Sequence, residues 1–127
     1  MEIITVTNNK KIEDSSNVVR VFGDYRDVLI KTRDLVYLGH ELISYPLNAS
    51  IKMFFSPIKS ILISSKRDFI SEDSVMLIEE SIMKYDLTLG QRKPEFRHEK
   101  DYELLDFELY KSSLEEASRF NSIRKGE

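Results

Sequence analysis

The hydrophobic positions in the first part of the chain form two short runs typical of strands. Residues 3–7 are mostly β-branched, and the run stops at Asn8 and Asn9, a pair that favours turns and left-handed backbone. Residues 18–22 form a second run of this kind, which ends at Gly23. We therefore predict two strands, each followed by a loop.

The next apolar positions recur at intervals of three and four, which is the spacing of one helix face. Asp24 precedes them as a helix-capping residue, and Gly39 follows the last of them at the place where a glycine commonly ends a helix. The apolar positions are Val28, Leu29, Thr32, Leu35 and Val36. The spacing predicts a helix from Tyr25 to Leu38.

Two extended segments are predicted between His40 and Ile70. They cover residues 41–45 and 60–64, and Pro46 and Pro57 lie in the connection between them. The second segment has three consecutive aliphatic residues between serines, a pattern typical of an interior strand covered by helices on both faces. These segments bring the expected number of strands to four.

Two further helices are predicted in the second half of the chain. Ser71 caps the first, with acidic residues in its first turn, and its apolar face is Val75, Ile78, Ile82 and Tyr85. Residues 86–100 are polar and lack periodicity, so we predict a loop or an internal hinge there.

The last predicted helix is amphipathic and about twenty residues long. Its apolar positions are Leu104, Leu105, Phe107, Leu109, Leu114 and Ala117. We expect the many carboxylates from Glu103 to Glu116 to point into solvent.

Together these elements predict an α/β fold with one three-layer-like domain over residues 1–127. Its sheet is small, mixed or mostly parallel, has about four strands and is covered by helices, with the amphipathic helix added at the C-terminus. A chain of 127 residues has the length of one domain and should bury about two-thirds of the surface that it exposes when unfolded.

Composition and charge exclude several classes of function. The chain has no cysteine, so thiolate catalysis, disulfides and cysteine-based metal sites are excluded. The formal net charge of −3 disfavours binding to nucleic acid. The N-terminal residues lack the features of a signal peptide, and no apolar run approaches the ~20 residues of a membrane span, so we expect a cytoplasmic protein without a membrane partner.

No strong catalytic motif is present, including the common phosphate-binding loops, the zinc protease helix and the serine hydrolase turn. The two histidines lie far apart and have no partner at ligand spacing, so we expect no metal site. The sequence also predicts no cofactor and no catalytic residue.

The densest polar segment is the connection over residues 44–60. Its hydroxyl groups and lysines can bind a phosphate or carboxylate if the backbone amides of the loop also turn inward. Alternatively, the serines make turn hydrogen bonds and the lysines are solvated. The candidate anion-binding residues in it are Ser50, Lys52, Ser56, Lys59 and Ser60.

Three residues outside this connection are further candidates. Asn8 and Asn9 follow a strand end, where many α/β sheets bind ligands, although the pair is also common in ordinary turns. His40 begins an extended segment after a helix-ending glycine, where α/β domains often place functional groups, but the simpler interpretation is that it complements the negative end of that helix.

Several motifs resemble those of the GrdX family, whose members are encoded beside glycine reductase components in anaerobic bacteria. The resemblance rests on the N-terminal segment 4–9, on the Gly-His-Glu-Leu run at 39–42, on the segments 46–52 and 56–64, and on the helix at 74–85. It covers approximately residues 1–85.

The resemblance implies an accessory protein of a glycine, sarcosine or betaine reductase system. It would be a non-catalytic binding or assembly factor that contacts a reductase component or a small anionic metabolite. The alternative is a small enzyme for a phosphorylated or carboxylated metabolite, in which Lys52 and Lys59 bind the anion and His40 acts as acid or base. A third interpretation is that the C-terminal helix builds a homodimer.

Overall fold

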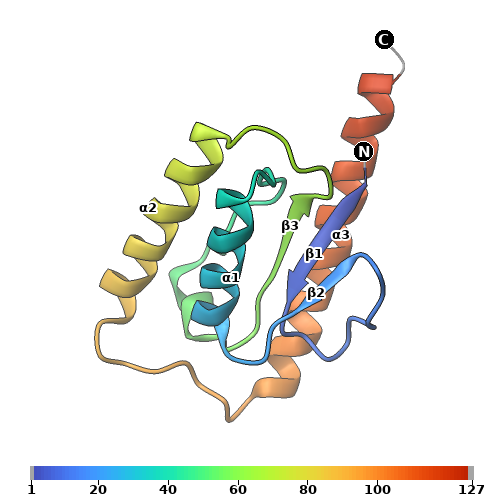
Figure 1. The fold of residues 1–127 in the computed structure, drawn as a ribbon. Coiled ribbons are helices and arrows are strands. Elements are labelled where there is room, and N and C mark those ends of the chain that lie inside the picture. Colours follow the sequence, from blue (N-terminus) through green and yellow to red (C-terminus); the bar gives the residue numbers. More distant parts are fainter. Residues whose placement is uncertain (1, 126–127) are drawn as a thin grey trace.

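The centre of the fold is a three-stranded mixed sheet with the strand order β2-β1-β3 (Figure 1). In the computed structural model, which describes residues 2–125 and the side chains of residues 2–119, the strands are β1 (Ile3–Thr7), β2 (Val18–Arg20) and β3 (Ser60–Ser64). β1 runs parallel to β2 and antiparallel to β3. An α/β fold with a small sheet, mixed or mostly parallel, was predicted; the α/β fold is confirmed, and the sheet is mixed with three strands instead of about four.

The two faces of the sheet differ in chemistry because successive side chains of a strand point to opposite sides. Val6, Ile61 and Ile63 lie on one face and belong to the hydrophobic core beneath helices α1 and α2. Thr7 and Ser60 lie on the other face, where their hydroxyl groups are 2.7 Å apart. The sheet therefore has an apolar face and a largely polar one.

Helix α1 (Tyr25–Tyr37) packs on the apolar face; it begins at the predicted residue and ends one residue before the predicted Leu38, which is its C-cap. Asp24 and Asp27 form a reciprocal capping box at its start. Gly39 follows its end with a φ of 108°, and a Cβ there would lie 2.2 Å from the carbonyl oxygen of Asp68. Both the backbone conformation and this close approach require glycine.

Helix α2 (Glu72–Leu89) packs against α1 and against the short 3₁₀ helix η1 (Ile51–Phe55). The predicted cap is confirmed, because the Ser71 side chain accepts a hydrogen bond from the backbone N–H of Ser74. The helix extends to Leu89, so the irregular connection covers residues 90–98 rather than the predicted 86–100.

The predicted strand at 41–45 is not confirmed, because this segment makes only one isolated bridge, from Leu42 to Ile63. The backbone N–H groups of Ile43 and Ser44 both donate to the carbonyl of Leu62, and the Leu62 N–H donates to the Ser44 hydroxyl instead of a backbone carbonyl. A side chain thus takes the place of a backbone partner in the ladder. The segment runs along β3 without becoming a fourth strand.

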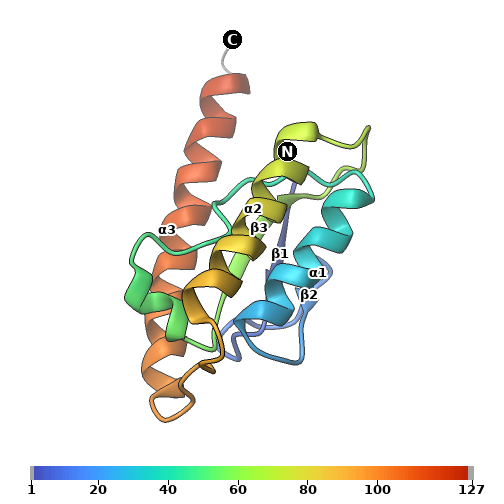
Figure 2. The same cartoon turned by 90° about the vertical axis from the view of Figure 1, so that its left-hand side faces the viewer.

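Helix α3 (Glu99–Lys125) contacts β3 from the polar face of the sheet (Figures 1 and 2). Helices therefore lie on both faces, with α1 on the apolar side and α3 on the polar side. No helix within the described residues has the length and apolar character needed to cross a membrane.

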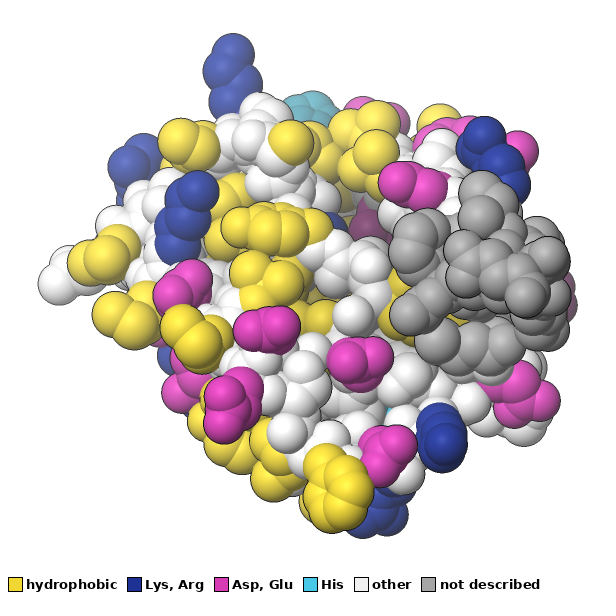
Figure 3. Space-filling view, turned by 90° about the horizontal axis from the view of Figure 1, so that it is seen from above, with side chains coloured by type: hydrophobic (Ala, Val, Ile, Leu, Met, Phe, Trp, Pro, Cys, Tyr) yellow, Lys and Arg dark blue, Asp and Glu magenta, His cyan; other side chains and the backbone are white. Residues whose placement is uncertain are grey.

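The end of the molecule where β3 connects to α2 carries a mixed surface. Viewed from this end, hydrophobic side chains are interspersed with acidic and basic ones (Figure 3). The exposed apolar residues at this end include Phe69 and Ile70, which lie in the connection from β3 to α2 and are 92% and 53% exposed. A concave site is found instead on the polar face of the sheet, where α3 lies.

Candidate functional site

Lys59 is a buried cation immediately before β3. Only 6% of its surface is exposed, and its Nζ donates a 2.8 Å hydrogen bond to Oδ1 of Asn48. The same nitrogen lies 5.8 Å from the centre of the Tyr25 ring. It forms no ion pair with a carboxylate within the described part of the chain. A buried amine with one protein acceptor has N–H donors left for a ligand.

Burial lowers the pKa of Lys59 to about 8, from an ordinary value of 10.5, because desolvation penalises the charged form. The negative charge of Asp106 opposes this shift and keeps the pKa from falling further. At pH 7 the amine is therefore mostly charged, with about one-tenth in the neutral form. Both forms are accessible near neutral pH.

A short turn and an asparagine side chain fix the position of Lys59. The Ser56 hydroxyl donates to the carbonyl of Ile58 and accepts from its N–H, which closes the turn before the lysine. The backbone N–H of Lys59 donates to Oδ1 of Asn8 at 3.0 Å. The Asn8 amide also donates to the carbonyls of Gly23 and Pro57, both at 2.8 Å. Asn8 thus ties three segments together around the lysine.

Tyr25 fixes the acceptor of the lysine. Its hydroxyl accepts a 3.0 Å hydrogen bond from the backbone N–H of Asn48 and donates to the carbonyl of Pro46. Burial raises the pKa of this phenol, so it stays protonated and can donate. The ring of Tyr25 packs against those of Phe54 and Tyr85 in the core. The rigid core therefore supports the partner of the Lys59 amine.

Asp106 is a buried carboxylate of α3 that the sequence interpretation missed. It was expected to point into solvent, but it is only 4% exposed. It accepts from the backbone N–H and the hydroxyl of Ser60, at 3.1 and 2.7 Å, and from the Asn9 amide at 2.9 Å. Three hydrogen bonds satisfy this carboxylate and bind α3 to the sheet.

The prediction that all carboxylates of this helix face solvent is wrong, because Glu103 is buried together with Asp106. The Asn9 amide donates to the carbonyl of Glu103 at 2.9 Å. Leu104, Leu105 and Leu109, predicted as part of the apolar face, are about half exposed. The helix docks through polar groups because the sheet presents hydroxyl and amide groups on this side.

A cleft of about 620 Å³ opens between α3 and the segment that precedes β3. Figure 2 shows this segment, teal to green, running from the C-terminal end of α1 past the sheet towards the side where α3 lies. Lys59, Ser60 and Asp106 line the cleft together with Asn48. Its apolar lining consists of Leu47, Ala49, Met53, Leu105 and Leu109. Such a lining suits a small organic ligand with one charged group.

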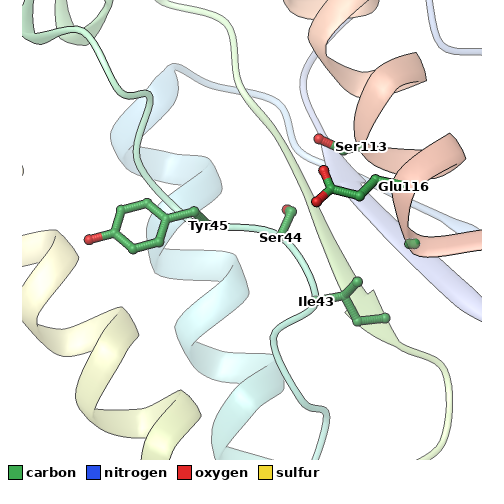
Figure 4. Close-up of a pocket in the computed structure, with 6 residues that line it drawn as sticks. Ile43, Ser44, Tyr45, Ser113 and Glu116 are labelled. Carbon is green, nitrogen blue, oxygen red and sulfur yellow. The ribbon is translucent and has the colours of Figure 1, made fainter. Parts of the chain in front are cut away.

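A second hollow of about 470 Å³ adjoins the cleft and shares Ser44, Tyr45 and Ser113 with it. In Figure 4, Ser113 and Glu116 of α3 face Ser44 across the gap, whereas the Tyr45 ring points away from it. The two hollows therefore follow the same boundary between α3 and the segment at 43–45.

The structure brings some predicted candidates together at the cleft and leaves others elsewhere. Lys59 and Ser60 lie at its floor, and Ser50 is an exposed residue of its wall. The side chains of Asn8, Asn9 and Ser56 are hydrogen-bonded to the protein and position this floor. Lys52 is exposed on η1.

His40 lies at the other end of β3. Its Nδ1 is 2.7 Å from the carbonyl oxygen of Ser64, and the imidazole is buried. Ser64 follows Lys59 by five residues along an extended chain, a separation of roughly 16 Å. The geometry therefore does not place His40 with Lys59. Among the described side chains, no cluster of three histidine or carboxylate residues could hold a metal ion.

Fold and site together define a small mixed-sheet α/β protein with a buried lysine at the floor of a cleft. The chain belongs to the family described as GrdX-like protein, whose profile matches residues 4–115. This range includes all of β1 except its first residue and most of α3, so the matched region contains every residue of the cleft floor. No curated protein and no solved structure matches the chain.

Proposed function

We propose that this GrdX-like protein binds a small organic acid in the cleft above Lys59 and acts as an accessory protein of a glycine, sarcosine or betaine reductase system. The observation that carries the binding role is the Lys59 amine, which is buried at the cleft floor and faces no carboxylate at ion-pair distance within the described residues. An anionic ligand would compensate this charge. The association with a reductase system is supported only by the name of the family.

The lining of the cleft supports a ligand with one anionic group and a short apolar body. Asp106 is a carboxylate that lines the cleft, and its oxygens already accept three hydrogen bonds from Ser60 and Asn9. The Lys59 amine has one protein acceptor only. An entering carboxylate or phosphate would therefore pair with the lysine rather than compete for an existing salt bridge.

Binding of the anion should weaken as the pH rises through about 8. The ammonium form of Lys59 attracts the anion, and its pKa of about 8 means that the charge is lost above that pH. Affinity should be nearly constant below pH 7 and fall about tenfold per pH unit well above pH 8. Isothermal titration with butyrate, and separately with inorganic phosphate, measures this and distinguishes a carboxylate from a phosphate ligand.

Two lysine variants provide the control for this titration. Lys59→Met should weaken binding about tenfold or more, because it removes a charge-assisted hydrogen bond. Lys52→Met changes an exposed lysine of η1 and should leave the affinity unchanged. Equal affinity in the wild type and Lys59→Met would contradict the proposed site.

The accessory role predicts a physical association with the reductase. The tagged chain, isolated from cells that express a glycine, sarcosine or betaine reductase, should be enriched in a subunit of that enzyme, as measured by mass spectrometry of the eluate. The same cells grown without reductase expression provide the control. Absence of every reductase subunit from the eluate would contradict this part of the proposal while leaving the ligand site to be judged by titration.

A further inference from the structure

Lys59, the cation of the cleft, is also a nucleophile when its amine is neutral. Nζ of Lys59 is directed at Asn48 Oδ1 at 2.8 Å, and the backbone N–H of the same Asn48 is held by the Tyr25 hydroxyl. These contacts fix the position of the amine in a cleft lined on one side by apolar residues. A rigidly placed amine that is shielded from water, and that lacks a carboxylate in direct contact within the described residues, has the environment of lysines that react with carbonyl groups.

We infer that Lys59 forms an imine with a small 2-oxo acid that enters this cleft. The inference rests on the proposed function, since it assigns the chemical class of the acid that the cleft would bind. A 2-oxo acid places its carboxylate next to the reacting carbon. The carboxylate would therefore lie beside the positively charged imine nitrogen and compensate it.

The reaction balances without an oxidant or a reductant. The lone pair of the neutral amine forms a bond to the keto carbon, the electron pair of the C=O bond moves to oxygen, and one proton passes from nitrogen to that oxygen. The resulting hydroxyl takes up one proton from solvent and leaves as water, while the nitrogen lone pair forms the C=N bond. The products are one water molecule and one protonated imine.

The protonation state of Lys59 supports this chemistry. Because burial lowers its pKa to about 8, about one-tenth of the amine is neutral at pH 7. An ordinary surface lysine, with a pKa of about 10.4, is neutral in roughly one molecule of 2,500 at this pH. A lysine exposed to water should therefore react far more slowly than Lys59.

Reductive trapping tests the inference. The whole chain is incubated at pH 7 with 2-oxobutyrate and sodium cyanoborohydride, and the modified residue is located by peptide mass spectrometry. We expect one reduced adduct per chain, on Lys59, in large excess over any adduct on the exposed lysines. Lys52→Met should react like the wild type, and Lys59→Met should lose the main adduct.

Butyrate separates failure of the inference from failure of the proposed function, because it has the carboxylate and the apolar body but no carbonyl. Butyrate binding that depends on Lys59, without a preferred adduct from 2-oxobutyrate, would overturn the imine and leave the anion site in place. An adduct spread evenly over surface lysines would also overturn it. If butyrate does not bind and no adduct forms, both proposals are wrong.

Discussion

Replacing Asp106 with alanine should lower the free energy of unfolding by about 3 kcal/mol. The substitution removes the acceptor of three donors, which are the backbone N–H and hydroxyl of Ser60 and the side-chain amide of Asn9. A buried donor that loses its partner costs about 1–3 kcal/mol, and water entering from the cleft can satisfy some of the three. Urea unfolding followed by circular dichroism measures the loss.

The matched control is Glu108→Ala on the same helix. Glu108 is exposed and forms a 3.0 Å surface ion pair with Lys111, so its loss should change stability by no more than about 0.5 kcal/mol. If both variants lose the same small amount, the hydrogen bonds of Asp106 contribute little to the docking of α3.

Replacing Lys59 with methionine should stabilise the protein at pH 7 while it weakens ligand binding about tenfold or more. The pKa of this lysine is about 8 in the folded chain and about 10.5 in the unfolded chain, so the unfolded state binds the proton more tightly. The folded state is penalised by about 3 kcal/mol below pH 8, and this penalty disappears as the pH rises to 10.5. Loss of the hydrogen bond to Asn48 offsets about 1 kcal/mol of the gain.

The net gain should therefore be about 2 kcal/mol at pH 7 and should turn into a small loss, of no more than about 1 kcal/mol, near pH 10.5. Urea unfolding of the wild type and Lys59→Met at both pH values measures this difference. Lys52→Met should unfold with the same free energy as the wild type at both pH values. A Lys59→Met variant that is less stable than the wild type at both values would mean that the amine serves the fold rather than a ligand. Stability sacrificed at a functional site is common in proteins.

Capping residues in the sequence were sufficient to predict where helices α1 and α2 begin. Helix α1 begins at an aspartate cap and ends before Gly39, and α2 begins after Ser71, because a cap acts within one helical turn. The segment at 41–45 has the composition of a strand and lies along β3. Its pairing with β3 ends because the N–H of Leu62 donates to the Ser44 hydroxyl instead of to a backbone carbonyl. No local sequence pattern predicts this side-chain acceptor.

The candidate site was predictable only in part, for a related reason. Lys59 and Ser60 are conspicuous as polar residues in a connection between apolar segments, and both line the cleft. The role of Asp106 depends on Asn9 and Ser60, which precede it by 97 and 46 residues. From sequence alone, Asp106 cannot be distinguished from the exposed carboxylates of the same helix, because its hydrogen-bond donors come from distant segments.

The polar attachment of α3 also has a consequence for synthesis on the ribosome. The hydrophobic core is formed by residues up to Leu89, so it can assemble while α3 is still inside the exit tunnel. Asp106 and the two cleft-lining leucines of α3, Leu105 and Leu109, reach the sheet only afterwards. A nascent chain can therefore fold its core before it can bind a ligand. The cleft is complete only when α3, the last of the described elements to emerge, packs on the sheet.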